Sequence, residues 1–175
     1  ETYLDFWAKY GRVLKEGIHL DPSNADRLGE LLRYESSGVE GWTALKTVVE
    51  AVQAESNRLG SLIPVILDAK RGDISSTAEA YAKSAFETLG AHCITLSPYL
   101  GKDSIEPFLN HPEKGVFLLC KTSNAGSMDL QNLLVMPMGS DMPMPLYIYV
   151  AKLAEQWNAN NNVGIVVGAT HPQIM

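Results

Sequence analysis

The sequence predicts an α/β protein in which helices cover a parallel β-sheet. Four short apolar runs rich in branched residues carry this prediction, at 62–67, 92–96, 116–120 and 163–167. Such runs are typical of strands that are buried on both faces of a parallel sheet. Stretches with helical periodicity separate the runs, and strands that alternate with helices indicate βαβ units.

Helical periodicity also precedes the first of these strands. Over residues 6–34, apolar side chains recur at three- and four-residue steps, with a break at 17–22. This pattern predicts two amphipathic helices. A further helix is predicted from Trp42 through Val52, and it ends near the polar stretch at 55–60.

Three more helices are predicted between the strands, at 76–89, 104–110 and 145–158. The connection at 123–144 breaks this rhythm, because it is rich in methionine and has poor periodicity. Long connections inside compact domains are often covers of active sites. We therefore expect a surface loop at this point in the chain.

Composition narrows the class of protein. The chain has 175 residues, of which 46% are apolar and 19% charged, so it is unlike a disordered polypeptide. A formal net charge of −6 argues against a broad nucleic-acid-binding surface, which would be basic. No apolar stretch approaches the ~18 residues of a membrane span, and no secretion signal is recognisable. We expect a cytoplasmic protein that binds neither nucleic acid nor membrane.

No metal site is predicted. Cys93 and Cys120 lie inside apolar runs without C-x-x-C spacing, which indicates two buried, reduced thiols. The four histidines are scattered and show no H-E-x-x-H or similar spacing.

The first candidate site follows the strand at 62–67. Asp68 and Lys70 are two residues apart, so both side chains are expected on the same face. Asp73 then enters the next helix, with residues 75–77 as candidate caps. Catalytic groups collect at the carboxyl ends of parallel strands, and a protonated lysine beside a carboxylate is a proton donor. A salt bridge at a strand end, followed by a capped helix, would explain the same spacing equally well.

A resemblance to a known family adds to this interpretation. The stretch D-A-K-R-G-D-I-S-S-T resembles the D-x-K-x-x-D-I-x-x-T signature of the orotidine 5′-phosphate decarboxylase family, in its bacterial-type branch. Four more blocks of the family occur in its order: V-E-G-W at 39–42, T-L-S-P-Y at 95–99, L-L-C-K-T-S-N at 118–124 and V-V-G-A-T at 166–170. The resemblance covers residues 35–175.

The resemblance implies a function and a set of residues. Members of this family convert orotidine 5′-phosphate to UMP in pyrimidine synthesis, without a metal or an organic cofactor. Lys70 would deliver a proton to C6 of the pyrimidine, and Asp68 would lie beside the departing carboxylate. Asp73 and Thr77 would reach the site of the neighbouring subunit in a homodimer. Ser123 would donate or accept a hydrogen bond at the base.

The chain also departs from the family pattern. A family lysine in a K-P-N context is not found upstream of Trp42. The family's glutamine- and glycine-rich phosphate loop and its arginine, which follow the last two strands of the barrel, are not found before Met175 either. Only four strands are predicted, whereas a (β/α)₈ barrel has eight and takes about 250 residues. We therefore expect a partial TIM barrel, and an incomplete chain that is inactive or weakly active.

Two alternatives stay open. Sugar-phosphate decarboxylases and synthases on the same barrel share the D-x-K-x-x-D spacing but use Mg²⁺ held by carboxylates. The other alternative is a non-catalytic chimaera or fragment. Residues 6–34, with F-W-A-K-Y-G-R-V-L-K-E-G-I-H and L-L-R-Y-E-S-S, resemble the middle domain of the ninety-kilodalton heat-shock chaperone family. We expect a helical segment over residues 1–36 and the partial barrel over residues 37–175.

Overall fold

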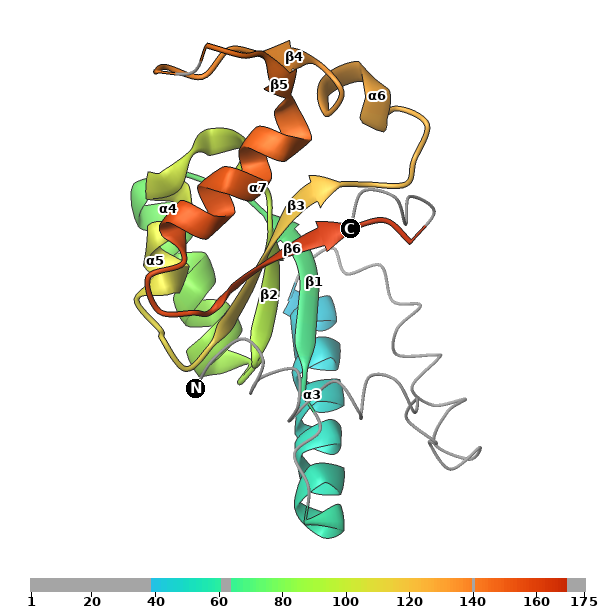
Figure 1. The fold of residues 1–175 in the computed structure, drawn as a ribbon. Helices are drawn as coiled ribbons and strands as arrows, with labels where there is room; N and C mark the ends of the chain where they lie inside the picture. The colour runs from blue at the N-terminus through green and yellow to red at the C-terminus, as the bar shows by residue number, and fades with distance from the viewer. Residues whose placement is uncertain (1–38, 61–63, 140, 170–175) are drawn as a thin grey trace.

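The computed structural model describes residues 39–60, 64–139 and 141–169 (Figure 1). The elements, in chain order, are α3 (Val39–Leu59), β1 (Ile66–Arg71), α4 (Ser75–Lys83), β2 (Cys93–Leu96), α5 (Glu106–Leu109), β3 (Gly115–Lys121), α6 (Ser127–Leu130), β4 (Leu134–Val135), β5 (Met144–Pro145), α7 (Leu146–Trp157) and β6 (Val163–Val167). One π-helical turn extends α4, and two short 3₁₀ turns follow β2. The two helices predicted over residues 6–34 lie outside the described residues.

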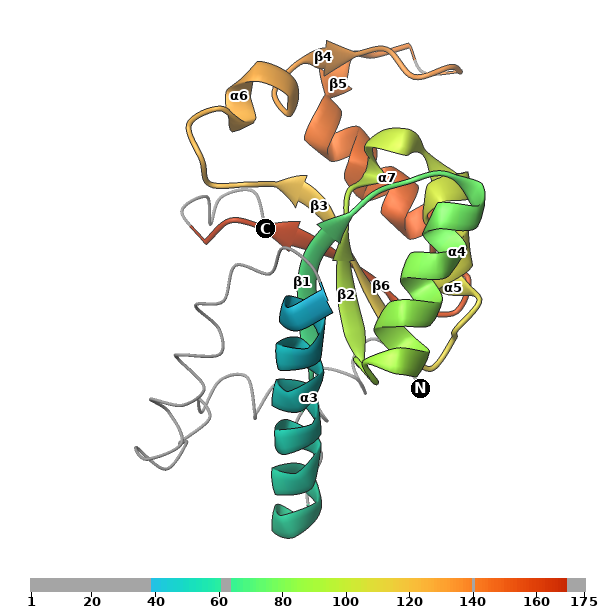
Figure 2. The ribbon, with the colours of Figure 1, turned by 180° about the vertical axis from the view of Figure 1, so that it is seen from behind.

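The main sheet is parallel and has the strand order β1-β2-β3-β6. Helices α4, α5 and α7 cover one face of it, as both views of the ribbon show (Figures 1 and 2). Helix α3 lies beside β1, away from those three helices, and its Gln53 amide donates a hydrogen bond to the Gly90 carbonyl at 3.3 Å. The predicted α/β architecture with a parallel sheet is confirmed.

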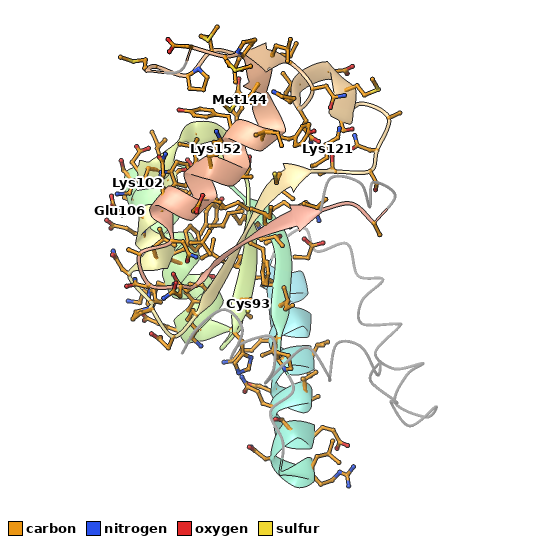
Figure 3. All side chains as sticks on the ribbon, viewed as in Figure 1. Cys93, Lys102, Glu106, Lys121, Met144 and Lys152 are labelled. Atoms are coloured by element: carbon orange, nitrogen blue, oxygen red, sulfur yellow. The ribbon has the colours of Figure 1, made fainter. Side chains whose placement is uncertain are left out.

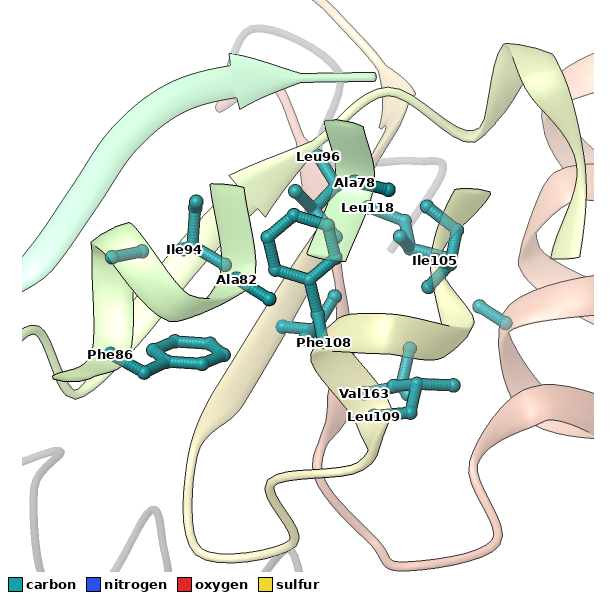
Figure 4. Close-up of a cluster of buried hydrophobic side chains, with 13 residues drawn as sticks. Ala78, Ala82, Phe86, Ile94, Leu96, Ile105, Phe108, Leu109, Leu118 and Val163 are labelled. Carbon is teal, nitrogen blue, oxygen red and sulfur yellow. The ribbon is translucent and has the colours of Figure 1, made fainter. Parts of the chain in front are cut away.

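The core lies between the sheet and its helical layer (Figure 4). Phe108 of α5 is 1% exposed and meets the Phe86 ring edge-on, with ring centroids 6.2 Å apart. The small side chains of Ala78 and Ala82 are also buried, which lets α4 approach the strands closely. The cluster also includes buried branched side chains of three strands: Ile94, Leu96, Val116, Leu118 and Val163.

The first strand differs from its prediction. It was expected at 62–67 and buried on both faces, but β1 runs from Ile66 to Arg71, and Ile66, Asp68 and Lys70 are exposed. The exposed residues alternate with Leu67 and Ala69, which pack against the core, so β1 is covered on one face only. Within the described sheet β1 is also an edge strand. Strand β2, which lies inside the sheet, is buried throughout, as predicted.

The connection at 123–144 is more ordered than predicted. It contains α6, and its strand β4 pairs antiparallel with β5, where Val135 lies opposite Met144. The Leu146 N–H donates to the Leu133 carbonyl at 2.8 Å, which fastens this hairpin to the start of α7. The predicted surface loop thus contains short elements that the sequence did not indicate, because two-residue strands are too short to show alternation. The segment does lie on the surface, with Met128, Met136, Met138 and Met142 exposed.

The cysteines behave as predicted, since both are free and buried. Burial raises the pKa of the Cys93 thiol to about 11 and also raises the pKa of Cys120. Every helix in the described part of the chain is too short or too polar to cross a membrane.

Phe108→Ala is expected to lower the free energy of unfolding by about 3–5 kcal/mol, because it leaves a cavity between α5 and the sheet. Tyr99→Ala is the matched control, since Tyr99 is 79% exposed. A change within about 0.5 kcal/mol is expected for the control. Urea unfolding followed by circular dichroism measures both changes, and equal losses would contradict the assignment of the core.

Candidate active site

Asp68, Lys70 and Thr95 form a closed hydrogen-bonded group across β1 and β2. The Lys70 Nζ donates to Asp68 Oδ2 at 2.5 Å, and the Thr95 hydroxyl donates to Asp68 Oδ1 at 2.7 Å. The same hydroxyl oxygen accepts the backbone N–H of Lys70 at 3.0 Å. Thr95 therefore holds both the side chain of Asp68 and the backbone of Lys70.

A bulge in β1 produces this arrangement. Leu67 pairs with Ile94 and Arg71 with Leu96, so three residues of β1 lie opposite the single residue Thr95. Lys70 lies in this bulge with φ 48°, in the left-handed region. Such a conformation costs a non-glycine residue on the order of 1–3 kcal/mol and is often found at functional sites. Asp68 and Lys70 come together as predicted, but through a bulge rather than a regular pleat.

The Asp68 carboxylate is electrostatically favoured in its ionised form. The hydrogen bond from Lys70 is the largest cause of its lowered pKa, and the hydrogen bond from Thr95 is the next. The side chains of Asp68 and Lys70 are 63% and 52% exposed, so a ligand can reach both. Thr95, by contrast, is buried.

Asp73 and Thr77 lie at the start of α4. Asp73 Oδ1 accepts the Ile74 N–H at 2.8 Å, and the Thr77 N–H donates to the Ile74 carbonyl at 3.1 Å. Within the described residues, neither side chain forms a hydrogen bond or ion pair with Asp68 or Lys70. The side-chain caps predicted at 75–77 are absent from the described contacts, because the N-cap is Ile74 and Ser75 has φ 44°.

Ser123 lies two residues after the carboxyl end of β3 and is exposed. Gly168, which follows β6, donates its N–H to the Lys121 carbonyl at 2.7 Å. A Cβ on Gly168 would lie only 2.9 Å from the Ser123 Cβ and 3.0 Å from its backbone nitrogen. The backbone at residue 168 thus reaches Ser123 closely because no side chain intervenes.

Comparison with known families identifies the chain. Residues 34–175 match the family described as "Orotidine 5′-phosphate decarboxylase / HUMPS family". The chain belongs to this family. The resemblance seen in the sequence is confirmed.

Curated relatives support the assignment. An orotidine 5′-phosphate decarboxylase of Roseiflexus castenholzii is 54% identical over 140 residues, which cover 79% of this chain and 47% of the relative. One of Herpetosiphon aurantiacus is 51% identical over 140 residues, with 79% and 48% covered. The chain therefore spans about half the length of the curated relatives it matches.

Solved structures agree with the fold. An OMP decarboxylase of Leishmania donovani matches with a TM-score of 0.67 and 56% identity, over 78% of this chain and 50% of that one. A structure from Toxoplasma gondii, titled as a putative orotidine-monophosphate decarboxylase, matches with a TM-score of 0.65 and 36% identity, over 76% and 49%. The four parallel strands and their helices are therefore part of a TIM barrel, as predicted.

A second family matches the start of the chain. Residues 1–59 match the family described as "Hsp90 protein". This match overlaps the decarboxylase match over residues 34–59, so the two do not fix a boundary. The division after residue 36 stays a prediction.

Sequence analysis of this decarboxylase-family chain missed Thr95 as a site residue. Thr95 lies in a strand whose other residues are apolar, and a hydroxyl in such a strand is easily taken for a core residue. The signal that could have found it is its position in T-L-S-P-Y, one of the family blocks. Lys121 was also missed: it is 3% exposed and donates to Ser127 Oγ at 2.9 Å (Figure 3).

The donor set fits a divalent metal poorly. Both oxygens of the Asp68 carboxylate already accept hydrogen bonds, one of them from an ammonium group. No group of three or more His, Cys, Asp or Glu side chains is close enough to hold a metal ion among the described residues.

Thr95→Val is expected to lower the free energy of unfolding by about 1–3 kcal/mol, because the Lys70 N–H loses its acceptor and Asp68 loses a donor. Thr95→Ser keeps the hydroxyl and should retain most of the stability. Urea unfolding measures both variants, and equal stability of Thr95→Val and the wild type would refute the role of the hydroxyl.

Acidification should remove the stabilisation that Asp68 provides. Because its pKa is lowered in the folded protein, its contribution is present above the ordinary value of 3.8 and is lost as the pH falls through the folded value. The contribution is modest, since solvent screens an exposed pair. We expect Asp68→Asn to unfold more easily than the wild type at neutral pH, and the difference in Tm to vanish in acid. A difference that persists unchanged in acid would contradict this account.

Proposed function

We propose that this chain carries the decarboxylating centre of an orotidine 5′-phosphate decarboxylase, a carbon–carbon lyase that forms UMP in pyrimidine synthesis. The observation that carries the proposal is the 2.5 Å contact between Lys70 Nζ and Asp68, within the family signature and at the carboxyl edge of the sheet. Membership of the family and the relatives' names support it.

The proposed chemistry follows from the charges of this pair. Breaking the bond between C6 and the carboxylate releases CO₂ and leaves the electron pair at C6. The Lys70 ammonium stabilises this developing charge and then transfers a proton from Nζ to C6. Asp68 orients the ammonium in advance and lies beside the substrate carboxylate. Lys70 recovers its proton from solvent, to which its side chain is 52% exposed.

We assign Asp73 and Thr77 to a site shared across a homodimer, and Ser123 to a hydrogen bond with the base. The exposure of Thr77 and Ser123 supports these roles, since each can reach a ligand or a second subunit. We also propose a cytoplasmic location, which the free, buried cysteines support because a reducing compartment keeps thiols unpaired.

Of the alternatives, the Mg²⁺-dependent sugar-phosphate enzyme is disfavoured by the Asp68 carboxylate, whose oxygens are both occupied by donors. A non-catalytic chimaera is favoured by one observation, the match of residues 1–59 to the Hsp90 family. If that is correct, the segments are residues 1–36 and 37–175, and substitutions at Lys70 will change no activity.

Turnover by a grafted enzyme separates these proposals. Residues 37–175 of this chain replace the matching segment of the Roseiflexus castenholzii decarboxylase, and conversion of orotidine 5′-phosphate to UMP is followed chromatographically. Lys70→Ala is expected to reduce turnover on the order of 10²–10⁴-fold, because the proton donor is lost.

Lys102→Ala is the matched control, since Lys102 is an exposed lysine that pairs with Glu106 at 3.7 Å. Its turnover should equal that of the unmodified graft. A folded graft without activity, or an active one indifferent to Lys70→Ala, would reject the proposed function.

A further inference from the structure

The Gln131 side chain forms two hydrogen bonds with Thr122, the residue that precedes Ser123. Gln131 Oε1 accepts the Thr122 backbone N–H at 2.9 Å, and Gln131 Nε2 donates to Thr122 Oγ1 at 2.9 Å. The Thr122 hydroxyl then donates to Asn124 Oδ1 at 2.6 Å. Gln131 therefore satisfies both the backbone and the side chain of Thr122, and this pair of bonds is called the Gln131 clamp below.

The Gln131 clamp lies just beyond the end of β3, where the chain forms no further ladder bonds with β6. Beyond the bond from the Gly168 N–H to the Lys121 carbonyl, the chain leaves β3 and turns into the segment that bears Ser123. The Thr122 N–H has no strand partner there and donates to Gln131 instead. The bond to the N–H fixes the peptide plane between Lys121 and Thr122. The bond to the hydroxyl fixes the Thr122 side chain, so the two bonds together hold the Thr122 Cα from which the chain continues to Ser123.

Gln131 is itself firmly placed. Its N–H donates to the Ser127 carbonyl and its carbonyl accepts the Tyr147 N–H, both at 3.0 Å. Ser127 in turn receives the buried ammonium of Lys121, which lies between the end of β3 and α6 (Figure 3). These bonds join α6 to both β3 and α7, so the clamp is anchored to the core and not to a free loop.

We propose that Gln131 is a positioning residue for base recognition, which acts by fixing Thr122 and thereby the hydroxyl of Ser123. This inference rests on the proposed function, because it takes the pyrimidine of a nucleotide as the partner of Ser123. Gln131 does not touch the base; its effect passes entirely through Ser123.

A double-mutant cycle on the full chain tests this proposal, with UMP as the probe and affinity measured by NMR titration. Gln131→Met has a similar length but no polar end, and Ser123→Ala lacks the hydroxyl. Each is expected to weaken UMP binding about fivefold to tenfold. Because both act on one contact, the double variant should be no weaker than Ser123→Ala alone.

Two further variants make the test specific. Gln131→Glu keeps the acceptor for the Thr122 N–H, but it can accept the Thr122 hydroxyl only in place of Asn124, so it should bind UMP more tightly than Gln131→Met and less tightly than the wild type. Gln156→Met changes an exposed glutamine on α7 and should have no effect. Hydrogen exchange should accelerate at the Thr122 amide in Gln131→Met while the amides of β2 stay protected.

The outcomes distinguish the two proposals. A wild-type chain that does not bind UMP rejects this inference, whereas the proposed function is tested separately by turnover of the grafted enzyme. If the wild type binds UMP, the clamp is rejected when Gln131→Met binds equally well, when the losses add in the double variant, or when exchange accelerates throughout the sheet. Non-additive losses, together with tighter binding by Gln131→Glu than by Gln131→Met, support it.

Discussion

Lys70 has a left-handed backbone conformation inside a β-strand, and the hydroxyl of Thr95 stabilises that conformation by accepting the Lys70 N–H. The bulge around Lys70 removes a regular ladder partner, and Thr95 supplies a replacement acceptor for its N–H. The same hydroxyl donates its proton to Asp68, so one buried side chain determines the geometry of the charged pair. An exposed ammonium and carboxylate would otherwise sample many positions, and a buried neighbour restricts them before any ligand arrives.

The two faces of the sheet differ, because α4, α5 and α7 cover one of them. Aromatic and branched side chains fill the space beneath α4, α5 and α7, and this packing fixes β2 and β3 as the most buried strands. Thr95 lies in β2, so the residue that organises the pair belongs to the most buried part of the sheet. The exposed groups that meet the ligand are carried instead by β1 and by the segment after β3.

The sequence predicted the parallel sheet and the pairing of Asp68 with Lys70, because apolar runs and i,i+2 spacing are local signals. The sequence misplaced β1, because an apolar run indicates buried residues. The second half of β1 is largely polar and exposed, so it does not belong to such a run. The sequence could not predict the bulge or the role of Thr95, which depend on the register between two strands. The role of Gln131 could not be predicted either, because it lies nine positions after Thr122 in the sequence, beyond α6.

The approach of Gly168 to Ser123 links two distant parts of the chain mechanically. Gly168 has no side chain that could rotate to absorb a displacement, and its backbone lies close to Ser123. A shift of β6 relative to β3 would therefore also shift Ser123, and the position of the serine hydroxyl depends on where β6 lies.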